Sequence, residues 1–159
     1  METILVSACL LGDNCKYNGG NNYSKKVELL KERYNIVPIC PEVFGGLKTP
    51  RVPSEIKDDA VINKNGKDVT FNFNEGAHKV INIVNFLHIK KAVLMERSPS
   101  CGVHQIYNGK FNGTLINGMG YTSRLLKAKG VQLYTIDEID ELIEDNKKNN
   151  SNENKESNL

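Results

Sequence analysis

The sequence predicts one α/β domain of three layers, in which helices cover both faces of a mostly parallel central sheet. Three observations favour this class. Short apolar runs rich in β-branched residues alternate with amphipathic helical segments along the chain. The segments between successive strands are long enough for crossover helices, which join parallel strands. The 159 residues also match the size of one ordinary domain.

The first third of the chain contains two predicted strands and one helix. Thr3 to Ala8 is a short apolar run and forms the first predicted strand. Ser24 to Arg33 places apolar residues among lysines and glutamates at helical spacing, and Ser24 is expected to cap this helix at its N-terminus. Asn35 to Ile39 is the second buried strand.

The middle of the chain begins with an expected hairpin. Ala60 to Phe73 alternates around Asn65-Gly66, a typical hairpin turn, and we expect this hairpin to be an insertion of unspecified placement. The helix that follows is expected to begin at Asn74. Later elements are predicted in this order: helix to Leu87, strand Lys91 to Glu96, turn or hairpin Tyr107 to Lys110, helix Thr122 to Lys129 ending at Gly130, strand Val131 to Tyr134 and helix Ile136 to Glu144.

The end of the chain differs in composition from the rest. Residues 146–159 are mainly Asn, Lys, Ser and Glu, and such a segment buries too little apolar surface to offset its ordering entropy. We therefore expect a single domain over residues 1–145 and a disordered polar tail over residues 146–159.

Charge and hydropathy exclude some partners. The net charge is +2, with 25% charged residues and no basic block, so we expect no nucleic-acid partner. No stretch approaches the ~20 apolar residues of a membrane helix. The first residues also lack the basic leader and apolar core of a signal peptide, which predicts a cytoplasmic protein without a membrane partner.

Three cysteines follow three predicted strands. Cys9 comes directly after the first strand, Cys40 ends the second, and Cys101 follows the third. Because the carboxyl ends of parallel strands meet at one edge of a sheet, we expect the three thiols to converge there. In a reducing compartment, such cysteines are more often metal ligands or nucleophiles than disulfide partners.

Dispersed cysteines favour an iron–sulfur cluster over zinc. Structural zinc sites use closely spaced pairs such as Cys-x2-Cys, and this chain has none. Iron–sulfur clusters accept ligands that the fold brings together. Three protein ligands leave one iron as an open Lewis-acid position. Cys15 remains a candidate fourth ligand, although we expect it to lie outside the group of three.

Three motifs occur in order along the chain: Ser7-Ala8-Cys9-Leu10-Leu11-Gly12, then Cys40-Pro41-Glu42-Val43 with Gly45-Gly46-Leu47-x-Thr49-Pro50-Arg51, and then Arg97-Ser98-Pro99-Ser100-Cys101-Gly102. Together they resemble the short thiouracil desulfidase family, long catalogued as a domain of unknown function. The resemblance runs from about Ile4 to Tyr134. One departure is Met95, where members tend to carry a lysine.

The resemblance implies a 4Fe–4S cluster bound by Cys9, Cys40 and Cys101, with Glu42 and Ser98 as catalytic side chains. It also implies hydrolytic removal of sulfur from a small thiolated pyrimidine, such as 2-thiouracil or 4-thiouracil, with release of sulfide. Glu42 is then expected to take a proton from the attacking water, and Ser98 to relay a proton or stabilise developing charge.

Three other interpretations remain open. The same thiols would also suit a non-catalytic module that stores iron or sulfur or senses redox state, although Glu42 beside Cys40 counts against it. A thiol enzyme would use Cys101 as nucleophile and His104 as its activating base. Gly118-Met119-Gly120 is a weak sign of phosphate binding.

Overall fold

The computed structural model describes residues 1–157, with side chains up to Lys148. Its centre is a four-stranded sheet in the order β2-β1-β5-β8, in which every neighbouring pair is parallel. This arrangement confirms the predicted α/β class. The strands are β1 (Thr3–Ser7), β2 (Asn35–Ile39), β5 (Lys91–Val93) and β8 (Gln132–Tyr134).

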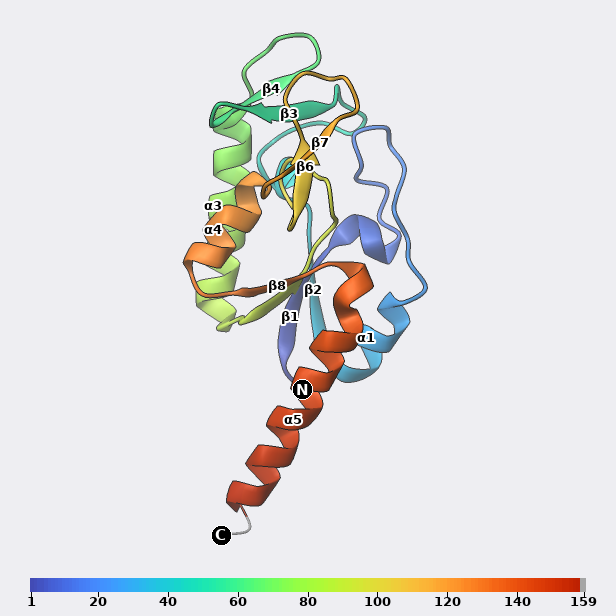
Figure 1. The fold of residues 1–159 in the computed structure, drawn as a ribbon, viewed down its shortest axis with the longest axis vertical. Coiled ribbons are helices and arrows are strands. Elements are labelled where there is room, and N and C mark those ends of the chain that lie inside the picture. The colour runs from blue at the N-terminus through green and yellow to red at the C-terminus, as the bar shows by residue number, and fades with distance from the viewer. Residues whose placement is uncertain (158–159) are drawn as a thin grey trace.

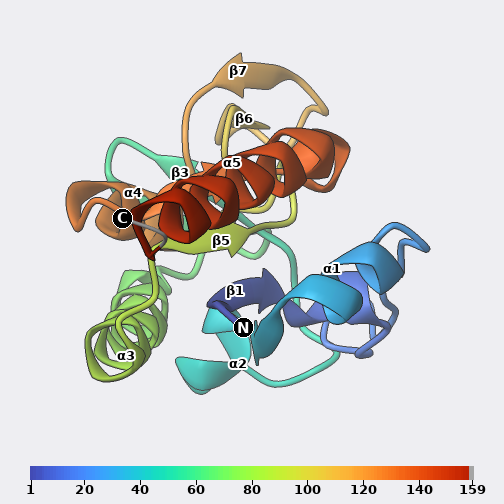
Figure 2. The ribbon, with the colours of Figure 1, turned by 90° about the horizontal axis from the view of Figure 1, so that it is seen from below.

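Helices cover both faces of the sheet, as predicted. Alternate residues of β1 point to opposite faces, so Ile4 and Val6 belong to one core cluster and Leu5 belongs to the other. The first cluster contains residues of α1 (Val27–Arg33) and α5 (Ile139–Ser157), and the second contains residues of α3 (Thr70–Leu87) and α4 (Tyr121–Ala128). Figure 2 shows β1 between α3 on one side and α1 on the other.

Two hairpins lie together beyond the carboxyl ends of β1 and β2, at the top of Figure 1. They are β3 (Ser54–Lys57) with β4 (Ala60–Asn63), and β6 (Gln105–Tyr107) with β7 (Leu115–Asn117). The second hairpin confirms the turn expected at residues 107–110. The carboxylate of Glu55 accepts hydrogen bonds from the amides of Gly109 (3.0 Å) and Phe111 (3.1 Å), which joins the two hairpins.

The chain reverses at Asn65-Gly66 as predicted, since the amide of Asn63 donates to the carbonyl of Lys67 and Ile62 forms an antiparallel bridge with Asp68. The longer hairpin of β3 with β4 turns earlier and was not predicted. The strands meet at Asp58 and Asp59, whose φ angles are 48° and 67°, because aspartates tolerate the left-handed region that this turn requires. Asn65-Gly66 forms a later turn, after which the amide of Val69 donates to the carbonyl of Val61. Helix α3 then begins at Thr70 rather than at Asn74.

The predicted cap of the first helix was also wrong. Helix α1 begins at Val27, with Lys26 at the N-cap position and no side-chain cap. Ser24 instead accepts the amide of Val27 at its backbone carbonyl, in a turn that precedes the helix. The end of α4 agrees with the sequence, because Gly130 follows it with a φ of 84°.

Helix α5 follows the short helix η2 (Ile136–Glu138) and continues to Ser157. Its helical backbone therefore includes most of the segment for which we predicted disorder. Side chains from residue 149 onward, and the last two residues altogether, lie outside the described part of the chain. The independence of the domain from this tail stays a prediction. No helix of the described residues is long and apolar enough to cross a membrane.

Two glycines allow the short helix α2 (Pro41–Phe44) to contact the backbone of α3. A Cβ on Gly76 would lie 1.8 Å from the carbonyl oxygen of Pro41, and a Cβ on Gly45 would lie 1.9 Å from that of Asn72. The amide of the Asn72 side chain also donates to the carbonyl of Gly45 at 2.9 Å. This close contact fixes α2, which carries two of the predicted site residues.

Candidate active site

The three predicted ligands lie at the carboxyl edge of adjacent strands. Cys9 is in the short helix η1 (Ala8–Leu11) directly after β1, and Cys40 is the N-cap of α2 directly after β2. Cys101 is in the loop that follows β5. Because β2, β1 and β5 are neighbours and parallel, their ends bring Cys40, Cys9 and Cys101 to one edge, as the sequence predicted.

Cys15 does not lie outside this group, so that expectation was wrong. Its buried thiol hydrogen-bonds to both Cys9 and Cys40, and these bonds raise the pKa of Cys15. The same bonds lower the pKa of Cys9, and they lower that of Cys40 to about 7. The loop of residues 13–20 folds back over η1, where the amide of Asn22 donates to the carbonyl of Cys9. Four thiols therefore surround the edge of the sheet.

Cys101 is the most deeply buried of the predicted ligands. Burial raises the pKa of its thiol to about 12, while hydrogen bonds from Ser7 and Ser100 oppose that rise. The hydroxyl of Ser100 lies 3.7 Å from the Cys101 sulfur. Electrostatic interactions with Cys9 and Glu42 place these groups in one environment. A bound cation at this point would favour the thiolate that burial alone disfavours.

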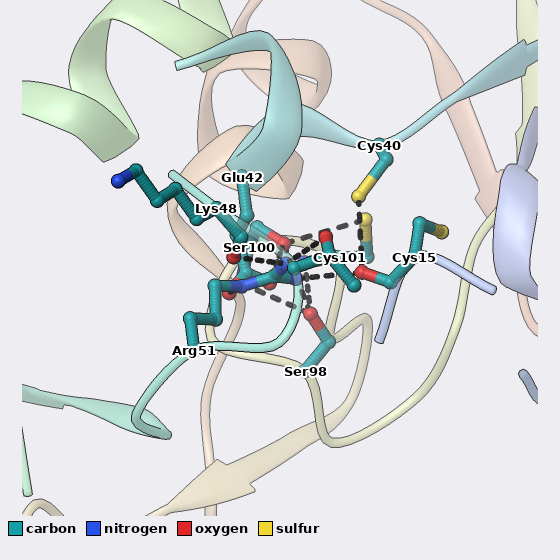
Figure 3. Close-up of polar contacts among 9 residues, drawn as sticks. Cys15, Cys40, Glu42, Lys48, Arg51, Ser98, Ser100 and Cys101 are labelled. Carbon is teal, nitrogen blue, oxygen red and sulfur yellow. Dashed lines mark hydrogen bonds and ion pairs between the residues drawn. The ribbon is translucent and has the colours of Figure 1, made fainter. Parts of the chain in front are cut away.

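The carboxylate of Glu42 is held between two partners, shown in Figure 3. Its Oε2 accepts a hydrogen bond of 3.0 Å from the Ser100 hydroxyl, and its Oε1 forms an ion pair of 3.3 Å with Nε of Arg51. The Glu42 side chain is 14% exposed and that of Arg51 is 8% exposed. A carboxylate so placed has a fixed orientation and little competing water.

Ser98, the predicted catalytic serine, does not contact Glu42. Its hydroxyl accepts hydrogen bonds from the amides of Ser100 (3.1 Å) and Cys101 (3.0 Å) and lies 3.0 Å from the Ser100 hydroxyl. Ser98 therefore shapes the turn that presents Cys101, and Ser100 stands between Ser98 and Glu42. The three side chains form one hydrogen-bonded chain.

The loop that carries these serines is held by one carboxylate. Oε1 of Glu96 accepts hydrogen bonds from the amides of Val103 (2.7 Å), His104 (3.0 Å) and Gln105 (3.3 Å). The closed loop also packs on α4, where a Cβ on Gly120 would lie 2.5 Å from the carbonyl carbon of Ser100. Both contacts restrict the positions available to Ser100 and Cys101.

A cavity of about 270 Å³ opens beside the thiols. Its lining includes the cysteines Cys15 and Cys40, the apolar residues Val43 and Phe44, and Thr49. Small-molecule sites commonly combine an apolar wall with a few polar groups.

The donor set fits an iron–sulfur cluster better than a single ion. Among the described residues, no three His, Cys, Asp or Glu side chains lie close enough together to bind one metal ion. A cluster spreads its cysteine ligands over several irons, so its ligands stand further apart than those of one ion. The lowered pKa of Cys9 and of Cys40 also favours the thiolate that iron binds.

The open alternatives receive little support. The ring of His104 is exposed and bonds to Glu138 at 2.8 Å, so it does not activate Cys101, whose buried thiol has a raised pKa. The amides of Gly118 and Gly120 donate to backbone carbonyls of His104 and Gly102, which leaves neither for a phosphate.

Sequence reasoning missed the contacts that Ser100 and Arg51 make with Glu42. Both occur in the quoted motifs, and a serine adjacent to a ligand cysteine was the available signal for Ser100. Arg51 gave no local signal, because its contact with Glu42 depends on how the loop after α2 folds. Met95, the departure from the family pattern, is partly buried against both core clusters, and its amide donates to the Ser7 hydroxyl at 2.9 Å.

Comparison with known proteins identifies the family of this chain. Residues 4–138 match the family model described as 2-thiouracil desulfurase. The chain is 38% identical over 150 residues to the uncharacterized protein YbbK of Bacillus subtilis (strain 168), covering 88% of this chain and 99% of that protein. A solved structure of the 4Fe–4S-dependent thiouracil desulfidase TudS matches with a TM-score of 0.85 and 40% identity, covering 90% of this chain and 96% of TudS. The chain belongs to the 2-thiouracil desulfurase family.

Proposed function

We propose that this protein hydrolyses the carbon–sulfur bond of thiolated pyrimidines of the 2-thiouracil or 4-thiouracil type and releases sulfide. Family membership and the likeness to TudS support this reaction. The observation that carries the proposal in this chain is the hydrogen bond from Ser100 to Glu42, which sets an acid–base pair beside the converging thiols. A storage or sensing module has no need of such a pair.

Cys9, Cys40 and Cys101 are the proposed ligands of a 4Fe–4S cluster, which matches the cofactor named for TudS. Held by three cysteines, such a cluster supplies one iron with an open position, a Lewis acid suited to a soft thiocarbonyl sulfur. Each of the three cysteine thiols loses its proton when it binds iron. A lowered thiol pKa therefore favours formation of the site.

Glu42 is the proposed general base. Its carboxylate takes a proton from the water that attacks the ring carbon, and Arg51 and Ser100 fix its two oxygens during this transfer. The hydroxyls of Ser100 and Ser98 form a chain through which a proton reaches the ring or the departing sulfur. The balance is one water consumed and one hydrogen sulfide released per oxo base, and no external electron donor takes part.

The proposed substrate is a free small molecule and not a base within a nucleic acid. Binding to a nucleic acid commonly depends on a strongly basic surface, and this chain carries a net charge of only +2. We place the reaction in the cytoplasm, since an iron with an open position and four unpaired thiols both require reducing surroundings.

The test is an assay of anaerobically reconstituted protein with 2-thiouracil, 4-thiouracil and their nucleosides. We expect uracil or uridine and sulfide in equal amounts. Glu42→Gln and Ser100→Ala should lower the rate and leave the cluster in place. A wild-type protein with an intact cluster and no action on any thiolated base or nucleoside would contradict the proposal and favour the sensing module.

A further inference from the structure

Arg51 makes five polar contacts that join three segments of the site. Its guanidinium donates from Nε to Glu42 Oε1 (3.3 Å), from Nη1 to Thr49 Oγ1 (3.0 Å) and the carbonyl of Lys48 (3.3 Å), and from Nη2 to the carbonyl of Cys15 (2.8 Å). Its backbone amide donates to the carbonyl of Tyr17 at 2.7 Å. All three side-chain nitrogens are therefore in use, as Figure 3 shows in part.

We propose that Arg51 is a positioning residue that holds the Glu42 carboxylate against Ser100. This inference rests on the proposed function, in which Glu42 is the base. Arg51 contacts only Oε1 of that carboxylate and leaves Oε2 for Ser100. A bidentate pair would instead have occupied both oxygens. The division orients one carboxylate oxygen toward the hydroxyl chain and fixes the plane of the carboxyl group.

The position of Arg51 also depends on the loop that carries Cys15. The carbonyl of Cys15 accepts Nη2 of Arg51 and lies 3.8 Å from the Cys40 sulfur. The bond from Arg51 is the shorter of the two and comes from a charged donor. The same guanidinium thus sets the base and anchors the loop over the ligand cysteines, which links formation of the metal site to orientation of Glu42.

The geometry calls for arginine rather than lysine. A guanidinium presents its donors in a rigid planar fork, whereas an ammonium is a compact point charge on a flexible stem. Lysine at this position would reach Glu42 or the carbonyl of Cys15, but a single nitrogen does not span both. Because the side chain is 8% exposed, water does not replace the contacts that are lost.

The kinetic test compares Arg51→Ala, Arg51→Lys and a matched control. We expect Arg51→Ala to lower kcat by about 10²-fold with little change in KM, because a misplaced catalytic group costs about that factor. Arg51→Lys should recover less than a tenth of the loss, and millimolar guanidinium ion should partly restore Arg51→Ala. The control is Arg124→Ala, which removes a 39% exposed arginine paired at 3.7 Å with Asp59. Full activity in Arg51→Ala or Arg51→Lys would overturn the proposal.

A double substitution shows whether Arg51 acts through Glu42. In a Glu42→Gln background, Arg51→Ala should cause no further loss of kcat, since the group that it positions is already disabled. If the fold-losses of kcat in the two single variants instead multiply in the double variant, Arg51 acts independently of Glu42. That result would overturn the assignment of Arg51 as a positioning residue.

Crystal structures of cluster-free Arg51→Ala and Arg51→Lys provide a readout that does not depend on activity. We expect the Glu42 carboxylate to leave Ser100 in Arg51→Ala and to turn away from one of its two partners in Arg51→Lys. An unmoved Glu42–Ser100 contact in both variants would overturn the inference. If the wild-type protein does not act on thiouracils, the proposed function fails, yet these structures still decide whether Arg51 positions Glu42.

Discussion

The hydroxyl of Ser100 donates a hydrogen bond of 3.0 Å to the carboxylate of Glu42, although 58 residues separate them in the chain. The contact depends on two neighbouring elements. Helix α2 carries Glu42 after β2, and the loop after β5 carries Ser100 beside Cys101. The proposed acid–base pair is therefore close in sequence to two proposed cluster ligands, Cys40 and Cys101.

The first prediction is that substitutions at this contact lower turnover without loss of the cluster. Glu42→Gln and Ser100→Ala should keep the full iron content and lower turnover by about 10²–10⁴-fold, the usual range for a lost proton transfer. Ser98→Ala should also lower turnover, because it removes the hydroxyl behind Ser100. The measurement is kcat with iron and sulfide counts on each variant, and Ser24→Ala serves as the control. Unchanged turnover in Glu42→Gln would remove Glu42 as the base.

A second prediction concerns the contact between α2 and α3. Gly76→Ala should destabilise the protein by about 1–3 kcal/mol, because the new methyl group overlaps the carbonyl of Pro41 and the backbone must shift. The shift would displace Cys40 and Glu42, so cluster assembly should fail as well. Thermal unfolding and iron content measure the two effects.

Asn82→Ala, at an exposed position of the same helix, is the matched control for Gly76→Ala and should change neither quantity. A Gly76→Ala protein of normal stability and iron content would show that α2 is not held by this contact.

A third prediction follows from the thiol pKa values of the cluster-free protein. The bond from Cys15, together with the amide of Val43, lowers the pKa of Cys40 to about 7. Below that pH Cys40 is a thiol, and above it a reactive thiolate, so its alkylation rate should rise through about pH 7 and then level off. Cys101, whose burial raises its pKa to about 12, should stay unmodified over this range.

Mass spectrometry of peptides from cluster-free protein treated with iodoacetamide at pH 6 to 9 checks these rates. Unfolded protein provides the reference, in which all four cysteines should react alike. Faster alkylation of Cys101 than of Cys40 would contradict this prediction, in which burial protects Cys101 and hydrogen bonding activates Cys40.

A fourth prediction assigns Cys15 to hydrogen bonding. Its thiol lies against Cys9 and Cys40, so it can donate its single proton to either of them when that partner is a thiolate. Cys15→Ala should keep the iron content and lower the reduction potential of the cluster, because hydrogen bonds to the sulfurs help to set that potential. A redox titration followed by paramagnetic resonance measures the shift. Loss of one iron or of the whole cluster would instead make Cys15 a ligand.

Much of this architecture could be predicted because it depends on local patterns. Asn35 to Ile39 reads as a strand from its apolar β-branched residues, and the parallel assignment then places Cys9, Cys40 and Cys101 at one edge. The same local reasoning missed the pairing of β3 with β4. Asn65-Gly66 forms the predicted turn, but an earlier turn at Asp58 and Asp59, which lacks the Asn-Gly signal, places Ile56 opposite Val61.

The details of the site depend on contacts between distant residues. Cys15 reaches Cys9 and Cys40 only because the loop of residues 13–20 folds back over η1, which no periodicity reveals. Nothing local in Ser98-Pro99-Ser100 shows which of the two serines reaches Glu42. The turn formed by hydrogen bonds to the Ser98 hydroxyl directs Ser100 to Glu42. Sequence could therefore predict that the three cysteines meet at one edge of the sheet, but not which of the two serines contacts Glu42.

The most direct test of the account is the iron and sulfide content, with the visible and paramagnetic-resonance spectra, of wild-type protein and four single cysteine variants purified without oxygen. The account predicts four irons and four sulfides per wild-type and Cys15→Ala chain, and loss of the cluster in Cys9→Ala, Cys40→Ala and Cys101→Ala. A wild-type protein without a cluster after anaerobic reconstitution, or an intact cluster in any of those last three variants, would contradict it.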